Sequence, residues 1–441
     1  MIHLDYTYAL KRKNEGGIEE GELEDVLKKL EKINREIQEK PYPFMELPFM
    51  SYELEEMKEL AASLREKPIS DVVLLGIGGS SLGAETLFRA ILSPEHNLKH
   101  RPRYWVLDNV DPITVSAAIE TIEKEKTLLI VVSKSGETPE TLSQFMLFKE
   151  ILEGVKDIKE KIVIITDKKR GLLKRIAEKE GYPSLSVPDG VGGRFSVLSP
   201  VGMFPALIMG IEVDEILEGA RRMAEHIREK RREENIAFVL SALLYLTDKK
   251  GKKNHVIMPY CDRLSGFSQW FRQLEAESLG KEGKGPTPIS SRGVTDQHSQ
   301  LQLYTEGPKD KFIIFIYVPS QGPIVPQSFP YIHEISYLSG KGLEKLFHSE
   351  LKGTMFSLVE ASVPVSEVWI DSISPYTIGA LFYLFEMAIV FFGRLLNVNP
   401  FDQPGVEKGK MYTKALMGLE GEESLKKMIA ELSREKFTVS F

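Results

Sequence analysis

The chain has 441 residues, 42% of them apolar and 27% charged, a composition typical of a globular protein with a large core and two or three domains. Its 57 basic and 64 acidic residues give a net charge of −7, which excludes a general electrostatic attraction to nucleic acid. A single cysteine, Cys261, excludes a disulfide framework, and the N-terminus lacks the apolar segment of a signal peptide, so we expect a cytoplasmic protein.

The first 70 residues carry a helical pattern. Six apolar residues recur at helical spacing, with Glu and Lys filling the other faces: Leu23, Val26, Leu27, Leu30, Ile33 and Ile37. Three prolines between positions 41 and 48 interrupt this stripe, and a second one begins at Leu54. A helix with one apolar face and one charged face packs against the protein core, so we assign these helices no catalytic or binding role.

From Asp71 the pattern changes to short apolar strands that alternate with helices. The predicted strands cover residues 72–75, 104–107, 128–132 and 162–165. This alternation predicts βαβ units and a doubly wound parallel sheet, in which ligands bind beyond the carboxyl ends of the strands.

The first of these strands is followed by the glycine-rich turn GIGGSSLG at residues 76–83. It does not fit the dinucleotide fingerprint GxGxxG, because Ser81 stands where the third glycine should be. The first acidic residue at the end of the next strand is Asp108, roughly ten residues later than the fingerprint requires. A nicotinamide cofactor is therefore not expected. Gly78 and Gly79 instead allow bare backbone to approach a ligand.

A second loop, SKSGET at residues 133–138, connects an apolar strand to a predicted helix. Thr138 is placed to be the N-cap of that helix and Pro139 its first residue, so the loop directs backbone N–H groups and a positive dipole end at one spot. Three hydroxyls without an aspartate favour a phosphate monoester, such as a sugar phosphate. The alternative is that the loop only caps the helix.

Two charged residues are further candidates. Arg194 lies in the glycine-dense segment 189–196, where it could stabilise an anion, although a lone arginine is also a common surface charge. Glu277 lies near an apolar helical stripe, at about the angular position of Trp270, whereas Glu275 points to the other side. Burial beside an indole would raise the pKa of a carboxyl towards that of a general base; the alternative is a buried ion pair.

The second half of the chain repeats the α/β pattern. We predict helices at 213–228 and 234–246, strands at 256–258, 312–318 and 367–370, and a buried helix at 376–396. A long polar loop is expected at 283–300, and a C-terminal helix follows residues 401–410. The sequence contains no CxxC, HExxH, GxSxG or EF-hand pattern, so we infer no metal and no serine-hydrolase chemistry.

Several blocks together resemble the glucose-6-phosphate isomerase (phosphoglucose isomerase) family in its bacterial form. The blocks are GIGGSSLG at 76–83, SKSGETPET at 133–141, DGVGGRFSVLSPVG at 189–202, QLEAESLGK at 273–281, TDQHSQLQL at 295–303 and FDQPGVEKGK at 401–410. They occur in order from the first strand to the last helices, and GGRFS and FDQPGVEKGK are signatures of that family.

This resemblance implies an α/β protein with two doubly wound sugar-isomerase (SIS) domains and helical extensions at both ends. We place the boundaries at 1–45, 46–212, 213–398 and 399–441. The resemblance also implies a homodimer whose active sites are shared between subunits. The implied reaction is the reversible conversion of glucose 6-phosphate to fructose 6-phosphate through an enediol(ate), without metal or organic cofactor.

Residue roles follow from the matching blocks. Ser133, Ser135 and Thr138 would hold the phosphate, with Lys134 beside them. Glu277 would move the proton between C2 and C1, His298 and Lys410 would open the sugar ring, and Arg194 would stabilise the enediolate. The residues implied to line the sugar are Gly78, Gly79, Ser80 and Gln403.

The chain departs from the animal form at Glu137, Pro139, Leu279 and Pro404. These differences affect the expected details of the loops rather than the chemistry. Two alternatives stay open: an isomerase that acts on mannose 6-phosphate or an amino sugar, and a catalytically silent regulator that binds sugar phosphates. Retention of Glu277, His298 and Lys410 together argues against the regulator, which would need only the hydroxyl loop.

Overall fold

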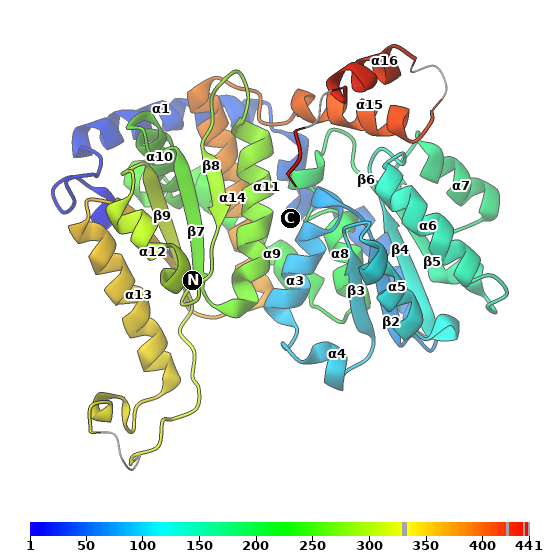
Figure 1. Ribbon diagram of the computed structural model, residues 1–441, viewed down its shortest axis with the longest axis horizontal. Coiled ribbons are helices and arrows are strands. Elements are labelled where there is room, and N and C mark those ends of the chain that lie inside the picture. The colour runs from blue at the N-terminus through cyan, green and yellow to red at the C-terminus, as the bar shows by residue number, and fades with distance from the viewer. Residues whose placement is uncertain (329–332, 420–422, 435–436, 440–441) are drawn as a thin grey trace.

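The computed structural model describes residues 1–328, 333–419, 423–434 and 437–439 and contains two α/β units, each built on a five-stranded sheet (Figure 1). The first sheet has the strand order β3-β2-β4-β5-β6 and is entirely parallel. Its strands are β2 (Asp71–Leu75), β3 (Arg103–Leu107), β4 (Thr127–Val132), β5 (Ile162–Asp167) and β6 (Ser184–Val187). The predicted fold class, α/β with parallel sheets, is confirmed.

The second sheet has the order β1-β10-β9-β7-β8, and its four later strands are parallel. These are β7 (Asn254–Tyr260), β8 (Thr287–Ser290), β9 (Lys311–Tyr317) and β10 (Val365–Ile370). The fifth strand, β1 (Ile2–Asp5), pairs antiparallel with β10 at the sheet edge. The helical interpretation of the first 70 residues is therefore wrong for these four residues, because a strand this short carries almost no periodic signal.

Both sheets are covered on both faces, so their strands are apolar without interruption. In β4, Leu128, Ile130 and Val132 face the core between the two sheets, while Leu129 and Val131 face the outer helices. Because side chains alternate along a strand, one apolar run supplies both layers. The second sheet repeats this division.

Helices of both units pack between the sheets, where Figure 1 shows α3, α9, α11 and α14. The helices of the first half are α1 (Glu20–Glu39), α2 (Ser51–Arg65), α3 (Leu82–Ile91), α4 (His96–Lys99), α5 (Pro112–Thr121), α6 (Pro139–Ile151), α7 (Leu172–Glu180) and α8 (Pro200–Ile208). Those of the second half are α9 (Val213–Glu229), α10 (Ile236–Lys249), α11 (Ser265–Leu279), α12 (Gln297–Glu306), α13 (Leu343–Glu360), α14 (Pro375–Leu396), α15 (Glu407–Leu416) and α16 (Glu423–Leu432).

Helix α14 is the one helix, among the described residues, that is long and apolar enough to span a membrane. Its most apolar 18-residue window is 89% buried inside the protein, as expected of a core helix. The prediction of a buried helix at 376–396 is therefore confirmed.

Two segments differ from the sequence interpretation. The expected polar loop at 283–300 contains strand β8 and the first residues of α12. Strand β6 also had no counterpart among the predicted strands. Both strands have four residues and are rich in Ser, Thr or Pro, so neither has the apolar run by which the longer strands were identified.

Candidate active site

The loop at residues 133–138 leaves the carboxyl end of β4 and enters α6. Ser133 is buried; its hydroxyl lies 2.9 Å from the Thr138 hydroxyl and accepts from the Gly136 N–H at 3.2 Å. Gly136 has a φ of +66°, which glycine adopts without strain. Thr138 is the N-cap residue, as predicted, but its side chain makes no capping hydrogen bond. The hydroxyls thus face one another across the loop and do not cap α6.

Lys134 adds a cation to this loop. Its side chain is half-buried, and this burial lowers the pKa of the ammonium group; Asp167 and Asp189 raise that pKa, and Arg194 lowers it. Lys134 therefore lies within electrostatic reach of Arg194, a residue of the second candidate loop.

The turn after β2 lies at the same sheet edge, because β2 pairs with β4 in parallel register with Leu75 opposite Val131. The turn is pressed against two other parts of the chain: a Cβ on Gly79 would lie 2.2 Å from the carbonyl carbon of Gly193, and a Cβ on Gly78 would lie 2.9 Å from Gln273 Nε2. Glycine at both positions allows this close approach. Ser80 ends the same short 3₁₀ turn.

Arg194 is 2% exposed and uses all five of its N–H groups. Its Nε donates to Ser278 Oγ at 2.8 Å, and one terminal nitrogen donates to Glu277 Oε2 at 3.1 Å and to Gln403 Oε1 at 2.9 Å. The other terminal nitrogen donates to the carbonyls of Pro400 at 2.6 Å and Asp402 at 3.0 Å. Burial lowers the pKa of Arg194 and Glu277 raises it. The guanidinium is a buried, fixed positive charge, not the surface charge considered as an alternative.

Glu277 lies near the end of α11, with a side chain that is 31% exposed. Its Oε2 accepts from Arg194, and its Oε1 accepts from Gln273 Nε2 at 3.0 Å. Trp270, the indole expected near Glu277, packs against Phe267 and Phe382. The carboxylate is therefore an accessible acceptor held by a cation and an amide.

The structure brings together Gly78, Gly79, Arg194, Glu277 and Gln403. The phosphate loop lies at the same edge through the pairing of β2 and β4. This arrangement can bind an anion at one end and place a base and a fixed cation at the other.

His298 and Lys410 are not part of this contact set. His298 is an exposed residue in the first turn of α12, and no hydrogen bond of its side chain occurs within the described ranges. Figure 1 shows α12 beside the second sheet, on the side away from α3. Lys410 is exposed on α15 and forms an ion pair with Glu407 at 2.7 Å.

Three residues of this site were not singled out from the sequence, although they lie in the same block as Glu277. Gln273 is one helical turn before Glu277, and Ser278 directly follows it. Lys281 pairs with Asp402 at 2.7 Å, which attaches the end of α11 to the segment that contacts Arg194. The i, i+4 spacing of Gln273 and Glu277 was a usable signal for the first of them.

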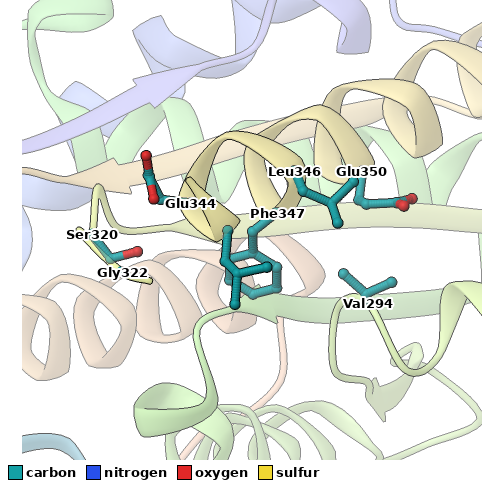
Figure 2. Close-up of a pocket in the computed structure, with 8 residues that line it drawn as sticks. Val294, Ser320, Gly322, Glu344, Leu346, Phe347 and Glu350 are labelled. Atoms are coloured by element: carbon teal, nitrogen blue, oxygen red, sulfur yellow. The ribbon is translucent and has the colours of Figure 1, made fainter. Parts of the chain in front are cut away.

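In the part of the chain that the structure describes, no group of three or more His, Cys, Asp or Glu side chains is placed to hold a metal ion. A separate cavity of about 330 Å³ lies beside α13, lined by Val294, Ser320, Gly322, Leu343, Glu344, Leu346, Phe347 and Glu350. Figure 2 shows Glu344 and Glu350 at opposite ends of a largely apolar lining. No predicted site residue lines this cavity, so it is distinct from the candidate site.

A family model described as Phosphoglucose isomerase matches residues 56–329 and 336–431. Glucose-6-phosphate isomerase of Carboxydothermus hydrogenoformans is 40% identical over 410 residues, which cover 89% of this chain and 88% of that protein. The enzyme of the same name from Rubrobacter xylanophilus is 40% identical over 430 residues, covering 96% and 99%. The solved structure of a hypothetical protein from Thermus thermophilus has a TM-score of 0.83 and 33% identity, covering 95% of this chain and 100% of that one. The chain therefore belongs to the phosphoglucose isomerase family.

Proposed function

We propose that this protein catalyses the reversible isomerisation of glucose 6-phosphate to fructose 6-phosphate. The observation that carries the proposal is the pair of Glu277 and Arg194, a base and a buried cation 3.1 Å apart, beside glycine backbone that can approach a sugar. Aldose–ketose isomerisation needs this combination, because a proton must move between C2 and C1 while negative charge develops on the oxygens. Membership of the family and the names of the 40%-identical relatives support the same reaction.

The proposed mechanism starts from the phosphate. Ser133, Ser135 and Thr138, with the Lys134 ammonium beside them, bind this group, so that remote binding energy places the reacting carbons. His298 and Lys410 then move the protons that open the ring. Gly78, Gly79, Ser80 and Gln403 line the open-chain sugar.

Glu277 next takes the proton from C2 of the aldose and returns it to C1, while the proton of the O2 hydroxyl passes to O1, which yields the ketose. Arg194 stabilises the intermediate enediolate by its charge, because all five of its N–H groups are bonded to protein atoms. A charge already in place needs little reorganisation when negative charge develops in the transition state.

The finer parts of the proposal are a homodimer with shared active sites, a cytoplasmic location and independence from metal ions. The dimer is supported by the position of His298, which is exposed and makes no side-chain hydrogen bond in the described part of its own chain. A second copy could bring this imidazole to the sugar ring. Activity that persists in excess EDTA would support metal independence.

The test is the substitution Glu277→Gln, measured by coupled assay of glucose 6-phosphate formed from fructose 6-phosphate. The amide keeps the shape and the acceptor for Arg194 but cannot take a proton, so we expect kcat to fall by about 100- to 10,000-fold. Binding of fructose 6-phosphate, measured by calorimetry, should change little. A variant that retains more than a tenth of the wild-type kcat would exclude Glu277 as the base.

A further inference from the structure

A second titratable pair lies under the active-site helix and is completely buried. His255, at the start of β7, and Glu275, on α11, are both 0% exposed, and His255 Nδ1 lies 2.7 Å from Glu275 Oε1. The outer atoms of the pair, His255 Nε2 and Glu275 Oε2, have no hydrogen-bond partner in the described structure. Burying two such groups with one polar atom of each left unpaired costs free energy.

The pair connects the sheet to the helix that carries the proposed base. Residues two apart on an α-helix point about 200° apart, so Glu275 faces β7 while Glu277 faces the sugar site. On the Glu277 side the helix is bonded to Arg194, through Ser278 and through Glu277 itself. Helix α11 is therefore attached on both sides. On the side of the sheet, Ser268 bonds Ser290 of β8 at 2.7 Å near the start of the helix, and His255 bonds Glu275 near the end that carries Glu277.

The imidazole also contacts α14, the other helix that leads to the site. The His255 ring stacks on Phe392 with centroids 6.1 Å apart. The chain after α14 supplies the carbonyls of Pro400 and Asp402 that accept from Arg194. One buried ring thus contacts the helix of the proposed base and the helix whose extension holds the proposed cation.

We infer that His255 and Glu275 are positioning residues for the isomerisation, which fix the rotation of α11 and so the position of the Glu277 carboxylate against the substrate. The inference rests on the proposed role of Glu277. Without this hydrogen bond the last turns of α11 can shift, because the remaining side-chain bond to the sheet, from Ser268 to Ser290, lies near the start of the helix. The phosphate loop, on the other sheet, stays in place. A displacement of about 1 Å at a catalytic group can cost about 100-fold in rate.

The experiment compares Glu275→Leu, the double variant His255→Leu/Glu275→Leu and Glu275→Gln. The double variant removes both polar partners, so it leaves no unpaired buried group and protects against a failure to fold. Glu275→Gln keeps an acceptor for the imidazole. We expect kcat to fall about 10- to 100-fold in the first two variants with KM within about twofold, and Glu275→Gln to stay within about threefold of wild type.

A second readout is specific to the position of the base. With glucose 6-phosphate deuterated at C2, the share of deuterium delivered to C1 instead of lost to solvent should fall in the first two variants. The matched control is Asp71→Leu, which removes a buried carboxylate bonded to Arg103 at the opposite, amino end of β2. It should lower the melting temperature and leave kcat and deuterium transfer unchanged.

The inference is overturned if the folded double variant has the kcat and deuterium transfer of wild type. It is also overturned if kcat falls as much in Asp71→Leu as in the double variant, or if Glu275→Gln is as slow as Glu275→Leu. These failures are distinct from failure of the proposed function. An active Glu277→Gln variant would exclude the proposed base, whereas an inactive Glu277→Gln beside a fully active double variant would exclude only the positioning role.

Discussion

At the scale of single residues, the site is organised around Arg194, whose hydrogen-bond donors are all used within the protein. The guanidinium of Arg194 joins the glycine-rich loop, α11 and the segment after α14, and each of its five donors has an acceptor. A lysine could not reproduce this planar set of contacts. The geometry is consistent with a charge built to act on a ligand without moving.

Another buried residue makes a pH-dependent prediction. Glu386, on α14, is 0% exposed, neither of its carboxyl oxygens has a hydrogen-bond partner in the described part of the chain, and burial raises its pKa well above the ordinary value. Because the folded protein keeps this carboxyl protonated more readily than the unfolded chain does, its contribution to the free energy of unfolding is fully present below the unfolded pKa. This contribution is lost as the pH rises towards the folded pKa.

The side chain of Glu386→Gln stays neutral at every pH. We therefore expect this variant to become more stable relative to wild type as the pH rises from about 4.5 to about 7.5. The gain is about 1.4 kcal/mol per pH unit while the folded wild-type carboxyl stays protonated. Melting temperatures at the two pH values measure the effect. The exposed Glu59→Gln is the control and should show no such trend, because Glu59 forms no ion pair in the described part of the chain. Parallel pH profiles for wild type and Glu386→Gln would contradict the assignment.

At the scale of elements, the phosphate loop leads into a helix, α6, whose first turn has no side-chain cap. Thr138 stands at the N-cap position, yet its hydroxyl lies 2.9 Å from Ser133 and caps no N–H. The positive end of α6 is therefore left without a side-chain cap. An anionic ligand can take the place of that cap.

The double variant Ser133→Ala/Thr138→Ala tests this loop. Each hydroxyl bound to a phosphate is worth about 1.5–3 kcal/mol, so we expect KM for fructose 6-phosphate to rise by about 100-fold or more. The helix content by circular dichroism should not change, because neither hydroxyl caps α6. Ser143→Ala on the same helix is the control, since its hydroxyl only bonds the Glu140 carbonyl. A double variant with wild-type KM would rule out phosphate binding at this loop.

At the scale of the whole molecule, the proposed catalytic residues are spread over distant parts of the chain. Glu277 and Arg194 are in contact, whereas His298 and Lys410 are exposed on α12 and α15. The C-terminal arm also leaves Met411, Leu416 and Met417 exposed. Exposed catalytic groups and apolar side chains are consistent with the proposed shared sites of a homodimer.

A mixing experiment tests the shared site. If His298 acts in the site of the partner subunit, a heterodimer of Glu277→Gln and His298→Ala contains one site with both residues intact. We expect the two inactive variants, unfolded and refolded together, to recover up to about half of the wild-type activity per heterodimer, which follows from one intact site in two. Each variant refolded alone is the control. Recovery no greater than the sum of these controls would place His298 in the site of its own subunit.

The sequence by itself determined the α/β class, the positions of most strands along the chain and the blocks that hold the candidate residues. These features are local: an apolar run of five residues in β4, a helical stripe, or a glycine beside Arg194 can be recognised within a short window. For the same reason the four-residue strands β1, β6 and β8 were not predicted.

Only the tertiary structure decided the environment of each charge. The partners of Arg194 lie 83 to 209 residues further along the chain, and His255 meets Glu275 across 20 residues. No periodicity encodes such contacts, because they depend on how whole helices pack between the two sheets. That packing bonds the Glu277 carboxylate to a guanidinium and an amide, and it buries Glu275 against a histidine of the sheet.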